Sequence, residues 1–234
     1  MLNKAYEYLN RDRLHNIDML ETLDRGNAEL LYADEEGVLM LSNSCGAYLI
    51  SSDDETLLDR LCGMMVSPVL ITAHQTKFLD LLSERFGFNT RNECFQCAYM
   101  SSERLDVLIP DGIELRELSM ADTDFVLAHY SHIPFREYIE DRIEAGMLGA
   151  FSDNKLAGFI GTHSDGSMGM LEVLSEYRNR GIAYSLEAAL INSLKEHKKI
   201  PYAQIFTTNS VSIRLQEKLG MSFSDKTLAW LFND

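Results

Sequence analysis

Positive charge is scarce in this sequence. Its 234 residues include 21 Lys and Arg but 36 Asp and Glu, which gives a formal net charge of −15 at pH 7. Proteins that bind nucleic acid or an anionic membrane need basic patches that contact phosphate groups. We therefore expect neither a nucleic acid nor a membrane among the partners. The acidic balance is compatible with a cationic substrate, although most acidic surfaces serve only solubility.

Long apolar segments are also absent. No uncharged apolar run approaches the roughly 20 residues that a membrane-spanning helix needs. The segment MLNKAYEYLNRDRLHNID at the start carries charges throughout and lacks the apolar centre of a signal peptide. The cytoplasm is therefore the expected location. Hydrophobic residues still make up 46% of the chain, which is ample for the cores of one or two domains.

Cysteine is too sparse to predict a metal site. The chain has four cysteines, of which only Cys94 and Cys97 form a C-x-x-C pair. A zinc site would need a second such pair or a histidine cluster. The segment around the pair has the pattern of a strand, in which residues i and i+3 point to opposite faces. We expect buried thiols and no metal.

Two common phosphate-binding loops are missing as well. Neither G-x-x-x-x-G-K-[ST] nor G-x-G-x-x-G occurs, which disfavours a nucleotide-binding protein of either of those kinds. The sequence contains a different candidate for an anion site.

That candidate lies between Gly169 and His197. The segment has the pattern of a short apolar strand, a polar turn and a helix whose apolar residues recur at helical spacing. A helix N-terminus has unpaired amides and a partial positive charge. Gly181 lets a ligand approach the backbone closely, while Arg178 and Arg180 add positive charge. The segment therefore predicts an anion site suited to a pyrophosphate.

Two motifs, in order, give the chain a family resemblance. Val173–Ala183 (V-x-x-x-Y-R-x-R-G-x-A) resembles the R/Q-x-x-G-x-G/A acyl-CoA motif of the Gcn5-related N-acetyltransferases (GNAT). Asn209–Met221 resembles that family's N-x-x-S-x-x-L-Y-x-K-x-G-F helix. The resemblance covers the chain from about Gly112 onward and is strongest to the two-part subgroup that includes glycine N-acyltransferase-like and FR47-like proteins. It implies an α/β (α+β) fold with a mixed, mostly antiparallel sheet flanked by helices.

The ends of the two halves repeat one pattern of strand, helix, glycine stop and strand. We therefore predict two tandem GNAT-like halves, residues 1–106 and 107–234, joined within residues 101–112. Only the second half has an acyl-CoA loop, so the first is expected to be degenerate. At an offset of 133 the matching positions are Leu82 and Leu215, Glu84 and Glu217, and Gly87 and Gly220.

The resemblance implies an acyl-CoA-dependent N-acyltransferase that uses no metal. It would transfer an acyl group, with acetyl-CoA as the expected donor, to the amine of a small molecule. The family's strand backbone holds the pantetheine arm, and its loop amides hold the diphosphate. The residues that this assigns here are Val173, Leu174, Arg178, Asn179, Arg180, Gly181, Ile182 and Ala183, with Asn209 and Ser212 from the second motif.

The chemistry needs a base, because a lysine-like amine has a pKa of about 10.4 and is protonated at neutral pH. Glu172, on the strand before the loop, and His163, at the end of the preceding strand, are the candidates. A carboxylate with a structural partner, an exposed loop histidine and a water chain are the alternatives. The family often places a glutamate a few residues earlier on this strand, and the equivalent position here falls near Ser167.

The family's general acid is a tyrosine in the second motif, where this chain has Gln216. An amide cannot give a proton to a thiolate, so Gln216 and the missing upstream glutamate leave a second function open. That alternative is a non-catalytic CoA-binding or sensory protein. The segment Ser119–Glu144 is expected to set acceptor specificity, and the sequence does not determine the acceptor or the oligomeric state.

Overall fold

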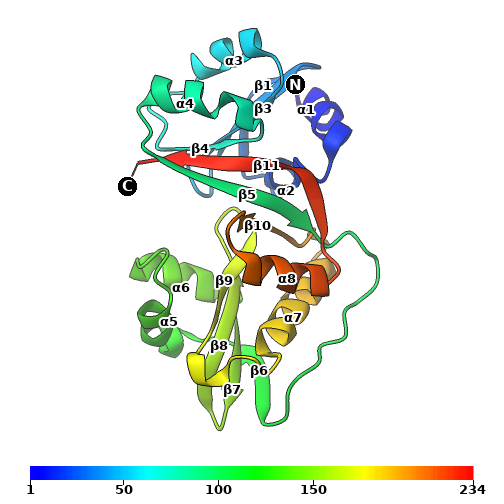
Figure 1. The fold of residues 1–234 in the computed structure, drawn as a ribbon, viewed down its shortest axis with the longest axis vertical. Helices are drawn as coiled ribbons and strands as arrows, with labels where there is room; N and C mark the ends of the chain where they lie inside the picture. The colour runs from blue at the N-terminus through cyan, green and yellow to red at the C-terminus, as the bar shows by residue number, and fades with distance from the viewer. Residues whose placement is uncertain (234) are drawn as a thin grey trace. The chain divides into compact units, whose positions relative to one another are not determined.

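The computed structural model describes residues 1–233 and divides into two compact units (Figure 1). Unit 1 comprises Met1–Ala98, Gln204–Ile213 and Ser222–Asp234, and unit 2 comprises Tyr99–Ala203 and Arg214–Met221. This division differs from the single cut expected between residues 106 and 107. The reason is that the last strand of the chain pairs with strands of the N-terminal half.

Unit 1 is built on a mixed sheet with the strand order β1-β2-β3-β4-β11-β5-β10. β3 and β4 are parallel, and β11 is antiparallel to both of its neighbours, β4 and β5. The elements are α1 (Leu2–Leu9), α2 (Ile17–Asp24), β1 (Ala28–Ala33), β2 (Gly37–Ser42), β3 (Tyr48–Ser52), α3 (Glu55–Cys62), β4 (Leu70–Ala73), α4 (Leu79–Phe86), β5 (Thr90–Ala98), β10 (Tyr202–Phe206) and β11 (Ser222–Phe232).

Both faces of the unit 1 sheet are buried. Successive residues of a strand point to opposite faces. Accordingly, Leu39 of β2 packs in the cluster that holds α3 and α4, while Val38 and Met40 pack in the cluster that holds α1 and α2. Each face of the sheet is therefore covered by a pair of helices that pack their apolar sides against it.

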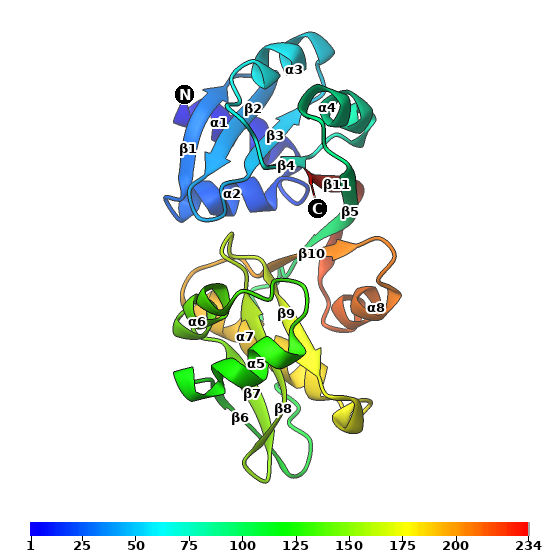
Figure 2. The same ribbon diagram turned by 90° about the vertical axis from the view of Figure 1, so that its left-hand side faces the viewer.

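Unit 2 has an antiparallel sheet with the strand order β6-β7-β8-β9. Helices α5 and α6 lie on one side of it and α7 on the other (Figures 1 and 2). The predicted hairpin turn is present, with Asp153 and Asn154 at φ of 49° and 62°. The elements are β6 (Ile113–Glu117), α5 (Thr123–His129), α6 (Arg136–Glu144), β7 (Leu148–Ser152), β8 (Lys155–Thr162), β9 (Met168–Val173), α7 (Ile182–Glu196) and α8 (Ser210–Lys218), the last shared between the units.

The two halves of the chain run through the same series of elements. The series β1-β2-β3-α3-β4-α4-β5 recurs as β7-β8-β9-α7-β10-α8-β11. Gly87 and Gly220, matched at the offset of 133, both follow their helices with left-handed φ values of 71° and 75°. One difference stands out, because β3 pairs with β4 whereas β9 and β10 belong to different sheets. The fold expected from the sequence, a mixed and mostly antiparallel sheet flanked by helices, is confirmed.

None of the helices within residues 1–233 has both the length and the apolar character that crossing a bilayer requires.

Candidate functional site

The predicted anion loop joins β9 to α7. Gly181 is the N-cap of α7 and has a φ of 88°, a left-handed conformation that a side chain would strain. Ile182 and Ala183 begin the helix, where backbone amides have no intrahelical acceptor. The Ser185 amide donates a hydrogen bond to the Gly181 carbonyl at 3.1 Å, which joins the first turn of the helix to its N-cap. Residues 178–181 therefore form an exposed turn at the start of a 15-residue helix, whose first residue, Ile182, is buried.

The two arginines of this loop have different roles. Arg178 donates from Nε to the carbonyl oxygen of Val173 at 2.9 Å, so it braces the loop against the end of β9. The guanidinium of Arg180 lies 5.4 Å from the centre of the Tyr177 ring and is exposed. Asn179, between them, has a φ of 61°. Arg180 is therefore the arginine of the pair that can bind an anion without loosening the loop.

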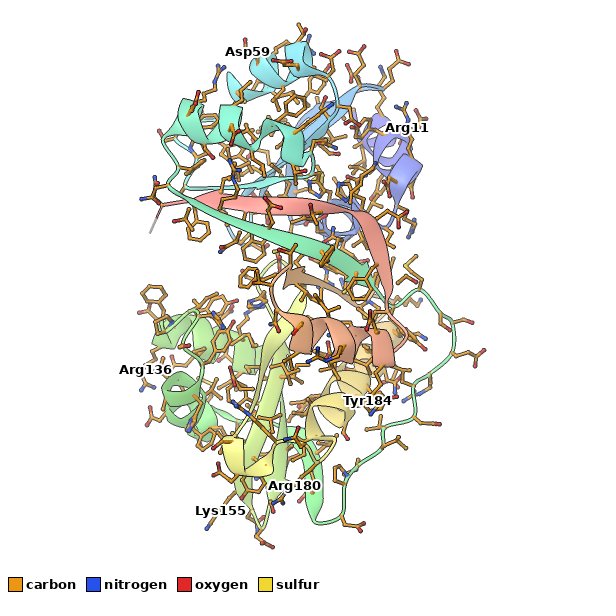
Figure 3. All side chains as sticks on the ribbon, viewed as in Figure 1. Arg11, Asp59, Arg136, Lys155, Arg180 and Tyr184 are labelled. Carbon is orange, nitrogen blue, oxygen red and sulfur yellow. The ribbon has the colours of Figure 1, made fainter. Side chains whose placement is uncertain are left out.

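Arg180 and Gly181 line a cavity of about 490 Å³. Figure 3 labels Arg180 and Tyr184, two of the residues that line it. The remaining walls are Tyr184, Lys218 and the linker residues 107–110. The Lys218 ammonium lies 5.0 Å from the centre of the Tyr184 ring. The sequence analysis did not identify residues 107–110 and Lys218 as walls of this cavity, because only the tertiary structure brings them to the loop, whereas Tyr184 directly follows Ala183 in the sequence.

A β-bulge lies in β9 just before the loop. Met170 has a φ of 52°, and the pairing with β8 shifts so that Met170 and Leu171 lie opposite the single residue Ile160. Bulges interrupt the hydrogen-bond ladder and re-aim backbone and side chains beside active sites. Methionine does not favour a positive φ, so the sequence carries no local signal for this feature.

Glu172 lies after the bulge and is half-buried. Burial raises the pKa of the Tyr130 phenol, and the charges of Tyr138 and Glu172 raise it further. Because Tyr130 ends α5, Glu172 lies on the side of the sheet that carries α5. Within residues 1–233 the Glu172 carboxylate forms no ion pair and no side-chain hydrogen bond. The alternative of a carboxylate with a structural partner is therefore not what the structure has.

His163 is packed rather than exposed. Its Nδ1 lies 2.8 Å from the Tyr138 hydroxyl, and its ring lies so close to Gly169 that a Cβ there would approach Nε2 to 2.4 Å. Burial lowers the pKa of His163, and the positive charge of Arg142 lowers it further. His163 thus lies near the first residues of β9, whereas Glu172 lies near the end that leads into the loop. The expected alternative of an exposed loop histidine is wrong.

The second motif begins α8. The Asn209 side-chain oxygen accepts a hydrogen bond from the Ser212 amide at 3.1 Å, which caps the helix. Both residues belong to unit 1, whereas the loop belongs to unit 2. Their contact with a pantetheine arm stays a prediction.

The Gln216 side chain forms a hydrogen bond with a buried carboxyl group. Its amide donates to Glu187 Oε1 of α7, and both side chains are almost fully buried. Burial raises the pKa of Glu187 to about 7, although the hydrogen bond from Gln216 opposes this. Ser167, near the expected upstream glutamate position, donates its hydroxyl to Asp165 at 2.7 Å. Neither Gln216 nor Ser167 can act as an acid or a base in the reaction.

Some residues of the expected acceptor segment are already engaged. Arg136 forms ion pairs with Asp124 and Glu140 on α5 and α6, and Tyr130 is buried. Phe135 is exposed at the start of α6.

The cysteine pair lies in β5, where Cys94 and Cys97 are both buried as predicted. Burial raises the pKa of the Cys94 thiol to about 12, so this thiol is inert at neutral pH. Across residues 1–233, no group of three or more His, Cys, Asp and Glu side chains is arranged to hold a metal ion.

Known proteins resemble this chain in part of its sequence and in its fold. Residues 147–231 match the model of the family described as FR47-like protein. No curated protein is similar enough in sequence to match. A Drosophila protein of known structure has 19% identity and a TM-score of 0.70 over 83% of this chain and 73% of its own.

Two further solved structures cover nearly the whole chain. A GCN5-related N-acetyltransferase from Kribbella flavida has 12% identity and a TM-score of 0.60 over 94% of this chain and 95% of its own. A tandem GNAT protein from the clavulanic acid biosynthesis pathway has 14% identity and a TM-score of 0.52 over 98% of this chain and 94% of its own. At such identities these likenesses establish the fold. The chain therefore has the fold of the Gcn5-related N-acetyltransferases, and its residues 147–231 carry the FR47-like match.

Proposed function

We propose that this chain is an acyl-CoA-dependent N-acyltransferase that moves an acetyl or other acyl group from CoA to the amine of a small molecule. The observation that carries the proposal is the left-handed Gly181 N-cap, which starts α7 without a side-chain cap and lines the cavity together with Arg180. Exposed helix-start amides with a nearby guanidinium bind phosphate oxygens. A cytoplasmic location and no resident metal complete the proposal.

In the proposed reaction, the neutral amine nitrogen attacks the thioester carbonyl carbon and a new C–N bond forms. Glu172, directly or through one water, accepts the proton that the nitrogen loses. The C–S bond then breaks, and its electron pair leaves on the CoA sulfur as a thiolate. Among residues 1–233 the Glu172 carboxylate has no ion pair and no side-chain hydrogen bond, which supports this role because the carboxylate is available to the incoming amine. The backbone around Val173 and Leu174 would hold the pantetheine arm.

No protein acid is needed for departure of the thiolate. A thiol with a pKa of about 8.5 is a fair leaving group, and the Gln216 amide is bound to Glu187. His163 is the second candidate base. Its lowered pKa keeps the ring neutral at pH 7, but its Nδ1 already faces the Tyr138 hydroxyl. We therefore favour Glu172.

A second function, a non-catalytic CoA sensor, is favoured by one observation. Gln216, at the position of the family's general acid, forms a hydrogen bond with Glu187 and cannot supply a proton. An assay of CoA release from acetyl-CoA over a panel of small amines, paired with calorimetric titration of acetyl-CoA, separates the two. The enzyme hypothesis predicts amine-dependent turnover. Tight binding with no turnover on any amine would favour the sensor, and no binding would contradict both.

A further inference from the structure

A buried tyrosine on the α5 side of the unit 2 sheet has a hydroxyl group without a partner. Tyr130 ends α5 and is only 5% exposed, yet within residues 1–233 its hydroxyl forms no hydrogen bond. Buried tyrosine hydroxyls usually find a hydrogen-bond partner, because leaving the group unpaired is unfavourable. The unpaired phenol therefore points to a ligand that would supply the missing oxygen.

Strand pairing places the proposed base on the same side of the sheet. Glu172 lies opposite Phe159 in the pairing of β9 with β8, and residues opposite each other in an antiparallel pair point to one face. Phe159 is buried in the cluster that also holds Tyr130 and Val126 of α5. Met170, at the bulge, belongs to the same cluster. The packing that fixes the Tyr130 ring is therefore continuous with the strand segment that carries Glu172.

The other polar groups on this face are already engaged. The Tyr138 hydroxyl lies 2.8 Å from His163 Nδ1, so these two groups satisfy each other. Burial raises the pKa of the Tyr130 phenol, and the charges of Tyr138 and Glu172 raise it further, so Tyr130 stays a hydrogen-bond donor at physiological pH. Of these four groups, Tyr130 thus offers an unpaired donor and Glu172 an unpaired acceptor.

A donor and an acceptor in this arrangement favour one class of acceptor substrate. An amine that reaches Glu172 supplies hydrogen-bond donors to the carboxylate, and an oxygen on the same molecule can accept from Tyr130. A neutral oxygen suits the site, because a carboxylate on the substrate would bring a second negative charge beside Glu172. An alkyl amine without oxygen would leave the buried hydroxyl unpaired.

We infer that Tyr130 is a specificity-determining residue that donates a hydrogen bond to the hydroxyl oxygen of an amino alcohol while Glu172 receives the amine. The inference rests on the proposed function and names the substrate class of the same site. A site built to hydrogen-bond a substrate oxygen discriminates strongly against the analogue that lacks it, since the protein group is then left unpaired.

Acetyl transfer to matched amines tests the inference. The panel pairs amino alcohols with alkyl amines of equal length, beginning with ethanolamine and propylamine, and adds glycine and β-alanine as carboxylate analogues. The wild type should acetylate an amino alcohol with a higher kcat/KM than its carboxylate analogue. In Tyr130→Phe the ratio of kcat/KM for amino alcohol to alkyl amine should fall at least about tenfold. Comparing this ratio between two proteins cancels differences in amine basicity.

Tyr138→Phe is the matched control, because it removes a hydroxyl that is already bound to His163 and should leave the ratio unchanged. Thermal unfolding provides a second readout. Tyr130→Phe should keep the wild-type midpoint, since the hydroxyl has no partner within residues 1–233. A lower midpoint would show that the protein itself uses the hydroxyl and would contradict the inference.

The kinetic outcomes separate the inference from the proposed function. An unchanged ratio in Tyr130→Phe, an equal fall in Tyr138→Phe, or turnover of other amines but of no amino alcohol would overturn the role of Tyr130 and leave the acyltransferase intact. A wild-type protein that acetylates no amine at all would remove the proposed function itself.

Discussion

At the scale of single residues, Glu172 is a half-buried carboxylate on β9 that has no ion pair or side-chain hydrogen bond with any other residue of the described range 1–233. The replacement Glu172→Gln keeps the shape and removes the ability to accept a proton. We expect kcat to fall about 10²–10⁴-fold, since that is the usual contribution of a general base, while the Kd for acetyl-CoA stays the same. Steady-state kinetics and calorimetry on one preparation give both values.

The matched control is Glu114→Gln, an exposed carboxylate on β6 of the same sheet, which should leave kcat unchanged. Equal rates for Glu172→Gln and wild type would show that Glu172 is not the base, and His163 or water would then accept the proton.

A second residue-scale prediction concerns the contact between His163 and Tyr138. Tyr138→Phe removes the hydroxyl that lies 2.8 Å from Nδ1 and keeps the ring. If His163 only supports β9, thermal stability should fall by about 1 kcal/mol, as for one lost hydrogen bond, with the shape of the pH–rate profile unchanged. A displaced pH optimum would instead make His163 the base.

At the scale of elements, the pairing of α7 with α8 depends on a buried acid. Burial raises the pKa of Glu187 to about 7, above its unfolded value near 4.5, so the folded state holds a proton there that the unfolded state releases. The contribution of Glu187 to the stability of unit 2 should therefore fall as pH rises from about 4.5 to 7. The full difference is about 3 kcal/mol.

Glu187→Gln should remove this dependence and stabilise unit 2 at pH 8, because a neutral amide can still bond to Gln216. Hydrogen exchange of β7–β9 amides at pH 5 and 8 measures it. Glu217→Gln, an exposed change one residue from Gln216, is the control. An unaltered pH response in Glu187→Gln would show that the carboxyl is ionised in the folded protein.

The same elements show what the sequence could and could not predict. The strand, turn and helix from Gly169 to His197 follow from local periodicity and a glycine stop, and the structure has them. The bulge at Met170 is set by pairing with β8, and the link between Glu187 and Gln216 joins helices 29 positions apart in sequence. Tertiary contacts determine both, and no local pattern encodes them.

At the scale of the whole molecule, the two compact units differ from the expected cut between residues 106 and 107 for a similar reason. The last strand, β11 (Ser222–Phe232), pairs with β4 and β5 of the N-terminal half. Strand alternation predicts a strand but not its neighbour in the sheet.

The two units should differ in how far their stability depends on pH. In unit 1, burial and the neighbouring His74 lower the pKa of His15 from 6.5 to about 4, against the opposing charges of Asp18 and Asp12. The unfolded state therefore binds a proton that the folded state does not, and unit 1 should lose about 2 kcal/mol between pH 6.5 and pH 5. In unit 2 the raised pKa of Glu187 adds stability over the same range and opposes the loss caused by the lowered pKa of His163, so unit 2 should lose less stability than unit 1.

Trp230, the single tryptophan of the chain, lies in β11 of unit 1 and donates to Gln204 at 2.7 Å. Its fluorescence therefore reports on unit 1, and exchange of β7–β9 amides reports on unit 2. In urea at pH 5 the fluorescence transition should precede the loss of exchange protection. Coincident transitions at every pH would contradict the prediction.

The most direct test of the account is calorimetric titration of acetyl-CoA into Gly181→Glu beside Gly46→Glu. Both glycines have left-handed φ values, 88° and 72°, so the backbone strain is matched, but Gly46 belongs to unit 1 whereas the loop belongs to unit 2. A carboxylate at residue 181 would occupy the anion turn and repel a diphosphate. The account predicts that Gly46→Glu binds acetyl-CoA like the wild type and that Gly181→Glu binds at least about 100-fold more weakly. Wild-type affinity in Gly181→Glu would contradict it.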